Sequence, residues 1–148
     1  MAKPFRILAA AAALLALAGG PAPAGDGAAR IVTILTSPDP QTQLMAMVLT
    51  MQSIRQGAAA RILLCGPAGD IALKDAPASA TAPQQPRGMS PQGLMKQIMA
   101  TGAPVQLCAI YLPNKGVGAD ALIDGVSAAR PPEMARHLIA DNTRLLSF

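Results

Sequence analysis

Two cysteines and one histidine carry most of the reactive chemistry available to this chain: Cys65, Cys108 and His137. Three such residues exclude a zinc site built from four Cys and His ligands, and there is no Cys-x-x-Cys pair. The residue types alone leave three roles open for the cysteines: buried small hydrophobes, a structural disulfide, or a reactive thiol. The choice depends on position, because cysteines on neighbouring strands have Cα atoms about 5.5 Å apart and can be bridged, whereas cysteines two strands apart cannot.

The other candidate acid–base residues show no pattern typical of a catalytic site. His137 lies between Met134 and Leu138 at helical spacing, so we interpret it as a structural or surface histidine and not as a general base. Asp120 and Asp124 are four residues apart on a short predicted helix, but no neighbouring feature indicates a shared site. We therefore interpret both carboxylates as solvated.

Two glycine-rich segments resemble nucleotide-binding motifs without the required context. Residues 116–121 match a relaxed G-x-G-x-x-A pattern, but they lie several residues beyond the preceding predicted strand, and Gly125 ends the following helix early. Residues 66–69 (GPAG) lack the Lys-Ser/Thr of a phosphate-binding loop. We interpret both as turns and predict that the protein binds no cofactor.

Methionine is abundant, which raises the alternative of a soft-metal site. Of the eight methionines, all but Met1 lie after the predicted leader, and thioethers together with cysteines can bind Cu(I). Most of them fall on apolar helical stripes, where Met is an adaptable core residue in a chain that has only three aromatic residues. We predict that the protein holds no metal. The methionines on these stripes are Met45, Met51, Met95, Met99 and Met134.

The N-terminus has the pattern of a secretory signal peptide over residues 1–24. Lys3 and Arg6 precede about a dozen apolar residues, and an A-x-A exit follows at 22–24, with 16–18 as a second candidate exit. An uncleaved anchor is the alternative, but a dozen residues fall short of the ~20 needed to span a bilayer. We predict a periplasmic protein that is not membrane-bound after cleavage, in a compartment that favours disulfides.

Composition argues for one domain and against nucleic-acid binding. The chain has 148 residues, 51% of them hydrophobic and 14% charged, so residues 25–148 can form a single domain with a buried core. Without Lys3 and Arg6, 10 of the 12 basic residues remain against 8 acidic ones. The mature chain retains only Tyr111 and Phe148 as aromatic residues. Neither a basic surface nor a stacking platform is therefore expected.

Strand and helix patterns alternate along the mature chain. Asp39-Pro40 and Ser90-Pro91 are typical helix starts, and the first helix carries so many apolar residues, Met45 and Leu49 among them, that we expect it to be buried around much of its circumference. A Pro-rich surface loop is predicted over 75–88. The predicted strands span 31–36, 61–65, 105–112 and 144–148, with a weaker one near Val126, and the predicted helices span 40–56, 91–101, 119–124 and 131–140.

This alternation predicts an α/β fold with a mainly parallel sheet of about five strands, covered on both faces. Functional sites in such sheets lie beyond the carboxyl ends of the strands. Cys65 ends the second predicted strand and Cys108 lies in the third. Both cysteines are therefore expected on or close to that edge.

The residues around Cys108 resemble a known family. The pattern Gly102-x-x-Val105-x-x-Cys108, the loop 114–116, the segment 122–126 and the closing residues 141–148 resemble the DsrE/DsrF-like family of sulfur-relay proteins. The first half is similar too, with a strand, Thr36-Ser37-Pro38, a long helix and a second strand ending in a Gly turn. The likeness covers most of residues 30–148 and depends on order and spacing more than on identities.

The resemblance implies a three-layer α/β/α fold, assembly into trimers or hexamers, and a cysteine at position 108 that accepts a persulfide sulfur from a donor protein and passes it to an acceptor. Cys65 is not expected from the family pattern, so it is either a resolving partner of Cys108 or an accident. We thus predict an exported sulfane-sulfur carrier with Cys108 as its functional residue. The alternative is a non-catalytic, oligomeric binding or assembly module with structural cysteines.

Overall fold

Five parallel strands form one sheet in the order β4-β3-β2-β1-β5. The computed structural model describes residues 27–148, so the predicted signal peptide lies outside the described residues. The predicted parallel sheet of about five strands is confirmed. The strands are β1 (Arg30–Leu35), β2 (Ala59–Leu64), β3 (Val105–Leu107), β4 (Ser127–Ala128) and β5 (Thr143–Ser147).

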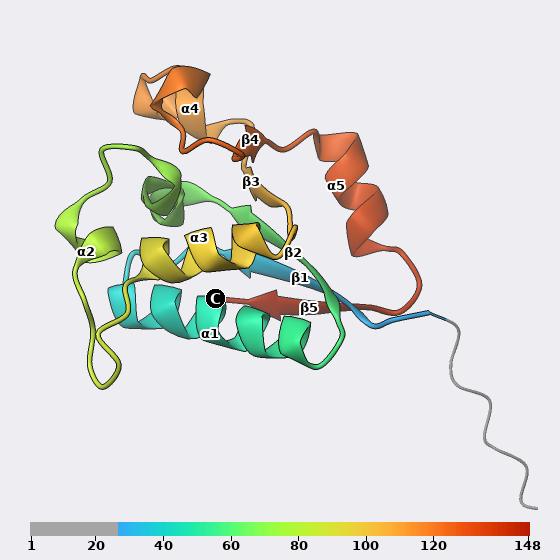
Figure 1. Cartoon of the computed structure of the whole chain (residues 1–148). Coiled ribbons are helices and arrows are strands. Elements are labelled where there is room, and N and C mark those ends of the chain that lie inside the picture. The colour runs from blue at the N-terminus through green and yellow to red at the C-terminus, as the bar shows by residue number, and fades with distance from the viewer. Residues whose placement is uncertain (1–26) are drawn as a thin grey trace, which may run out of the picture.

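Helices lie on both faces of this sheet. Figure 1 shows α1 (Pro40–Arg55) and α3 (Pro91–Ala100) side by side over one face, and α5 (Pro131–Leu138) away from them beside the other end of the sheet. The three-layer arrangement expected from the sequence is therefore present. Shorter helical segments connect the strands: the 3₁₀ helix η1 (Gly66–Ala72), α2 (Ala78–Thr81), α4 (Tyr111–Lys115) and the 3₁₀ turn η2 (Ala119–Ala121).

The two long helices begin at the caps that the sequence predicts. The Asp39 carboxylate accepts a hydrogen bond from the backbone N–H of Thr42 at 2.7 Å, which lowers the pKa of Asp39. The Ser90 hydroxyl oxygen accepts one from the N–H of Gly93 at 3.1 Å. A proline follows each cap at the first helical position, where its missing N–H costs nothing. These caps fix where each helix starts relative to the strand that it covers.

The main core lies between the sheet and the α1–α3 pair. Alternate residues of β1, β2 and β3 point into it and meet the apolar stripes of both helices, as expected for strands with a period of two. Thr33 and Thr50 are fully buried there and share a hydrogen bond of 2.6 Å between β1 and α1. The largest apolar side chains of this core are Leu35, Met47, Ile62, Leu64, Ile71, Met95, Ile98 and Leu107.

Helix α1 is more one-sided than its sequence predicts. Met45 and Leu49 are 52% and 42% exposed, so the expectation of burial around much of the helix is wrong. Polar residues take core positions instead: the Gln43 amide nitrogen donates to the carbonyl of Ser37 and the Thr50 hydroxyl to that of Ala46. The Gln43 side-chain oxygen is buried without a hydrogen-bond partner among the described residues. Of the methionines assigned to helical stripes, Met51, Met95 and Met134 are buried, and Met99 packs partly buried against the core.

Strand β3 is shorter than its sequence predicts. The apolar run over 105–112 continues, but the strand ends at Leu107, and the backbone N–H of Tyr111 donates to the carbonyl of Cys108 at 2.9 Å to close a turn. Tyr111 then begins α4 and packs its ring over the backbone of Gly69 in η1. Aromatic packing on a neighbouring segment therefore overrides the local strand pattern.

A smaller apolar cluster lies on the other face of the sheet, under α5. Val32 and Leu63 pack there against Ala129 and Met134, with Leu138, Ile34 and both cysteines at its margin. Coverage is thinner here than on the α1 face, because Leu145 of β5 is 52% exposed. This thinner face is the one that carries the cysteine side chains.

The predicted surface loop over 75–88 is largely exposed but not wholly irregular. It contains the single helical turn α2, whose Ala80 is buried, and the Gln84 amide donates to the carbonyl of Pro40 at 2.8 Å. Within residues 27–148, no helix is long and apolar enough to cross a membrane.

Candidate functional site

Cys65 and Cys108 lie opposite each other on neighbouring strands and form a disulfide. Strands β2 and β3 pair in parallel with Leu64 beside Leu107, so the next residue of each strand is a cysteine. Their Cα atoms are 5.0 Å apart, within the range that a disulfide spans. The structure therefore brings together the two residues that the sequence singled out, at the carboxyl ends of their strands.

The two sulfur atoms lie on the face of the sheet that α5 covers. Both cysteines are half-buried at the margin of the Val32–Leu63–Ala129–Met134 cluster. A cavity of about 230 Å³ lies beside Cys108, and its walls are almost entirely apolar. Cys65 does not line it, so the two sulfurs differ in what they face. The wall residues are Leu63, Ala109, Ala129, Pro131, Met134, Ala135 and Leu138.

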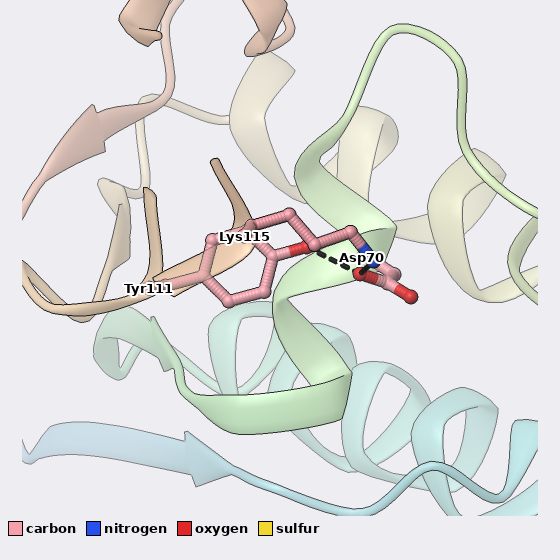
Figure 2. Close-up of polar contacts among 3 residues, drawn as sticks. All are labelled: Asp70, Tyr111 and Lys115. Atoms are coloured by element: carbon pink, nitrogen blue, oxygen red, sulfur yellow. Dashed lines mark hydrogen bonds and ion pairs between the residues drawn. The ribbon is translucent and has the colours of Figure 1, made fainter. Parts of the chain in front are cut away.

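Three polar side chains form a network just beyond the disulfide, shown in Figure 2. The Tyr111 hydroxyl donates to the carboxylate of Asp70, and the Lys115 ammonium lies 2.8 Å from the same carboxylate oxygen. Asp70 belongs to η1, which follows Cys65, whereas Tyr111 and Lys115 belong to α4, which follows Cys108. The network thus ties together the two segments that leave the cysteines.

The network fixes the charge states of its members. Partial burial opposes ionisation of Asp70, but the hydrogen bonds from Lys115 and Tyr111 outweigh it and hold the pKa of that carboxyl below its usual value. Burial, together with the hydrogen bond to the ionised Asp70, raises the pKa of Tyr111. Near neutral pH Asp70 is therefore a carboxylate and Tyr111 an un-ionised phenol.

A hollow of about 600 Å³ opens at this edge of the sheet. Its wall contains the residue after Cys65 and residues two and three positions after Cys108, together with the polar network, but neither cysteine lines it. Ile110 stands at the rim with 72% of its surface exposed. The lining residues are Gly66, Pro67, Asp70, Ile110, Tyr111, Asn114 and Lys115. The carboxyl edge thus offers a surface on which a partner can approach the cysteine pair.

The remaining residues considered from the sequence lie elsewhere. His137 lines a hollow at the amino ends of the strands, with Arg30 and Arg61, and not the wall beside Cys108. Asp120 and Asp124 flank Lys74, whose ammonium donates to the carbonyl of Asp120 and lies 3.7 Å from the carboxylate of Asp124. Across residues 27–148, no three His, Cys, Asp or Glu residues gather in a way that could hold a metal ion.

Asp70 and Tyr111 are the site residues that the sequence did not reveal. Tyr111 was assigned to a strand, and Asp70 follows a turn that carried no chemical motif. The one available signal is Gly69, because a Cβ at that position would overlap the Tyr111 ring. A glycine there is required by close packing and not by a special backbone angle.

The parallel five-stranded sheet in this order, with helices on both faces, is a DsrE/YchN-like α/β fold. Comparison with solved structures agrees. YchN from E. coli superimposes with a TM-score of 0.63 at 22% identity, covering 82% of this chain and all of YchN. MTH1491 from Methanobacterium thermoautotrophicum, described as a protein of unknown function, gives a TM-score of 0.60 at 12% identity over 81% of this chain and 99% of its own.

These two likenesses establish the fold. No protein-family model matches the sequence, and no curated protein matches it either. The function therefore has to be argued from the site itself. The arrangement offers a cysteine pair that can open and close by thiol–disulfide exchange, an apolar cavity beside Cys108, and a hollow at the same edge of the sheet that contains Asp70, Tyr111 and Lys115.

Proposed function

We propose that this protein is an exported sulfane-sulfur carrier in which Cys108 accepts the sulfur and Cys65 resolves it. The observation that carries the proposal is the placement of two opposed cysteines at the carboxyl edge of a DsrE-like sheet, with one sulfur facing an apolar cavity. The disulfide seen in the structure is then the oxidised resting form. A dithiol reductant opens it before the first sulfur is loaded, and again whenever the Cys65 branch has closed it.

The sulfur step balances without metal or cofactor. The Cys108 thiolate attacks the outer sulfur of a donor persulfide R–S–SH, the donor S–S bond breaks, RS⁻ leaves, and Cys108 becomes Cys–S–SH. An acceptor thiolate can then take the outer sulfur from Cys108. In its absence, the Cys65 thiolate attacks Sγ of Cys108, hydrosulfide leaves, and the disulfide forms again. In that branch two thiols are oxidised and one sulfane sulfur is reduced to sulfide.

Cys108 is assigned as the acceptor because of its surroundings. Sulfane sulfur is soft and weakly hydrated, so it is accommodated better by apolar walls than by water. The cavity of about 230 Å³ provides such walls beside Cys108, and Cys65 does not line it. The distance of 5.0 Å between the two Cα atoms puts Cys65 within reach of Cys108, which supports its proposed role as the resolving thiol.

Export to the periplasm is part of the proposal. The signal-peptide pattern over residues 1–24 supports it, and a disulfide between the cysteines fits an oxidising compartment. N-terminal sequencing of the protein secreted by a Gram-negative host gives the cleavage site. Retention of the full-length chain in the cytoplasm contradicts this part.

Assembly into a homo-oligomer is also proposed. The exposed apolar side chains of Met45 and Leu49, one turn apart on α1, support an interface between copies, since isolated monomers seldom leave neighbouring large apolar groups exposed. Light scattering on the mature chain should give a trimer or hexamer. A monomer at all concentrations contradicts it.

Trapping the intermediate tests the sulfur assignment. Reduced protein is freed of reductant, exposed to a small persulfide, alkylated and mapped by mass spectrometry. Cys65→Ser should accumulate one extra sulfur on the Cys108 peptide, because the resolving thiol is absent. Cys108→Ser is the matched control and should carry none. Equal loading of both variants, or loading of neither, contradicts the proposal.

A non-catalytic binding module with a structural disulfide is the second candidate. The half-buried position of both cysteines beside an apolar cluster favours it, because such a bridge also fastens β2 to β3. It predicts that neither cysteine takes up sulfur after reduction and that reduction only lowers thermal stability. The trapping experiment therefore separates the two candidates.

A further inference from the structure

A second hollow lies at the opposite edge of the sheet, at the amino ends of the strands. It has a volume of about 320 Å³ and is lined by Arg30 of β1, Arg61 of β2, Thr143 of β5 and His137 of α5, together with backbone and apolar atoms. Strands β1 and β2 and the C-terminal α5–β5 segment thus bring two guanidinium groups and one imidazole to one place. No acidic residue lines the hollow.

The cationic groups in this hollow lack carboxylate partners. The ion pairs formed among residues 27–148 involve Lys74, Lys115 and Arg130, and neither Arg30 nor Arg61 has an acidic group within 4.0 Å. Arg61 is held in place instead, because its guanidinium donates to the Gln106 side-chain oxygen at 2.5 Å. A fixed guanidinium retains free N–H groups for a further acceptor.

Burial and the positive charges of the cluster lower the pKa of His137. Burial and then the charges of Arg61, Arg136 and Arg30 lower the pKa of this imidazole, and only Glu133 acts in the opposite direction. Glu133 itself pairs with Arg130 at 2.9 Å. The region is therefore a local excess of positive charge in which the imidazole stays neutral near pH 7.

We propose that this hollow binds a small oxyanion, with Arg61 and Arg30 as the charged donors and His137 as a donor that gains its second proton when the anion is bound. Guanidinium groups match the spacing of oxygen atoms in sulfate, phosphate, thiosulfonate and carboxylate groups. The anion is either a free inorganic ion or the acidic end of a small organic molecule. The volume of about 320 Å³ admits either.

The site is independent of the proposed sulfur chemistry. The hollow is lined at the start of β1 and β2, whereas the cysteines follow the ends of β2 and β3. Reduction of the disulfide, or replacement of both cysteines by Ser, should leave anion binding unchanged. Failure of one proposal therefore carries no consequence for the other.

Titration calorimetry with sulfate tests the proposal. The full mature chain should bind one sulfate per chain saturably, and Arg61→Gln should weaken binding at least about tenfold, the effect of losing a charged hydrogen bond. Arg30→Gln should weaken it too, and this exposed residue can be changed without loss of the core. Arg87→Gln, on the loop before α3, removes the same charge far from the hollow and should bind as the parent does.

Two further arms sharpen the result. Sulfate keeps its charge between pH 5.5 and 8, so tighter binding at pH 5.5, abolished by His137→Gln, assigns the extra proton to His137. Comparison of sulfate and thiosulfate with methanesulfonate and acetate distinguishes an inorganic ion from an organic acid. Non-saturable binding, or equal weakening by the Arg61, Arg30 and Arg87 variants, overturns the proposal.

Discussion

The two edges of the sheet differ in whether their charged and reactive groups have partners within the protein. At the carboxyl edge, every charged group of the network has a partner: Asp70 is held by Tyr111 and Lys115, and the cysteines are joined to each other. At the amino edge, Arg30 and Arg61 converge with His137 without a carboxylate between them. The charged groups of the first edge are paired within the protein, whereas no carboxylate lines the hollow that contains the arginines of the second edge.

This difference separates two kinds of site on one fold. At the carboxyl edge the two cysteines are joined by a disulfide, which has to be reduced before either thiol can react. At the amino edge the proposed event is the binding of an anion by Arg30 and Arg61. Such binding should depend on salt concentration and pH. The following predictions test the contrast, from the largest expected effect to the smallest.

Opening the disulfide should have the largest effect on stability. The bridge closes a loop with a sequence separation of 43, for which the chain-entropy relation gives about 4 kcal/mol of stabilisation. Thermal unfolding with and without reductant should differ by roughly 15 °C for a domain of this size. The Cys65→Ser/Cys108→Ser variant is the control and should not respond to reductant. Equal melting temperatures with and without reductant for the parent protein would show that the bridge does not constrain the chain.

Gly69→Ala should be the next most damaging change. The added Cβ would overlap the Tyr111 ring, and forced repacking of this kind costs about 1–3 kcal/mol. Denaturant unfolding measures the loss. In a Tyr111→Ala background the same substitution should cost much less, because the obstructing ring is gone. A full penalty in both backgrounds would contradict the close packing of η1 against α4.

Asp70→Asn should lower stability near neutral pH by about 1 kcal/mol, a typical value for a partly exposed charged hydrogen bond. The pKa of Asp70 is lowered in the folded state, so its contribution is present above the unfolded value of 3.8 and is lost as the pH falls through the lower folded value. The parent and the variant should therefore converge in acid. Unfolding measured at pH 7 and below pH 3.8 tests this, and a constant gap across both conditions would contradict it.

His137→Gln should have the smallest effect, visible only in the pH profile. The pKa of His137 is lowered in the folded state, so the unfolded chain binds more protons and stability decreases as the pH falls from 6.5 through the folded value. The variant should lack this part of the slope. Added sulfate should reduce the slope in the parent but not in the variant. An unchanged slope in the variant would mean that another group titrates there.

The sequence predicts much of the scaffold because its signals are local. Asp39-Pro40 and Ser90-Pro91 predict where the two long helices begin, and the short β-branched runs predict buried strands. Order and spacing then suffice for a parallel α/β sheet with both cysteines near one edge. These features depend on residues that are close together in the chain.

What the sequence did not predict depends on contacts between distant segments. Tyr111 lies outside the strand that its sequence predicts, because its ring packs over Gly69 of η1 in the segment after β2. Met45 and Leu49 are exposed, whereas Gln43 and Thr50 of the same helix are buried and donate hydrogen bonds to backbone carbonyls. The pairing of Cys65 with Cys108 required β2 and β3 to be neighbours, which strand order alone decides.

Sulfide release in a single turnover tests the central claim most directly. Reduced protein, freed of reductant, is mixed with a persulfide donor, and hydrosulfide and free thiols are measured together. The parent should release one sulfide per chain while both thiols disappear, and Cys65→Ser should retain the sulfur on Cys108 and release none. Release by Cys108→Ser equal to that of the parent, or release with both thiols still free, would contradict the assignment of Cys108 as the sulfur acceptor.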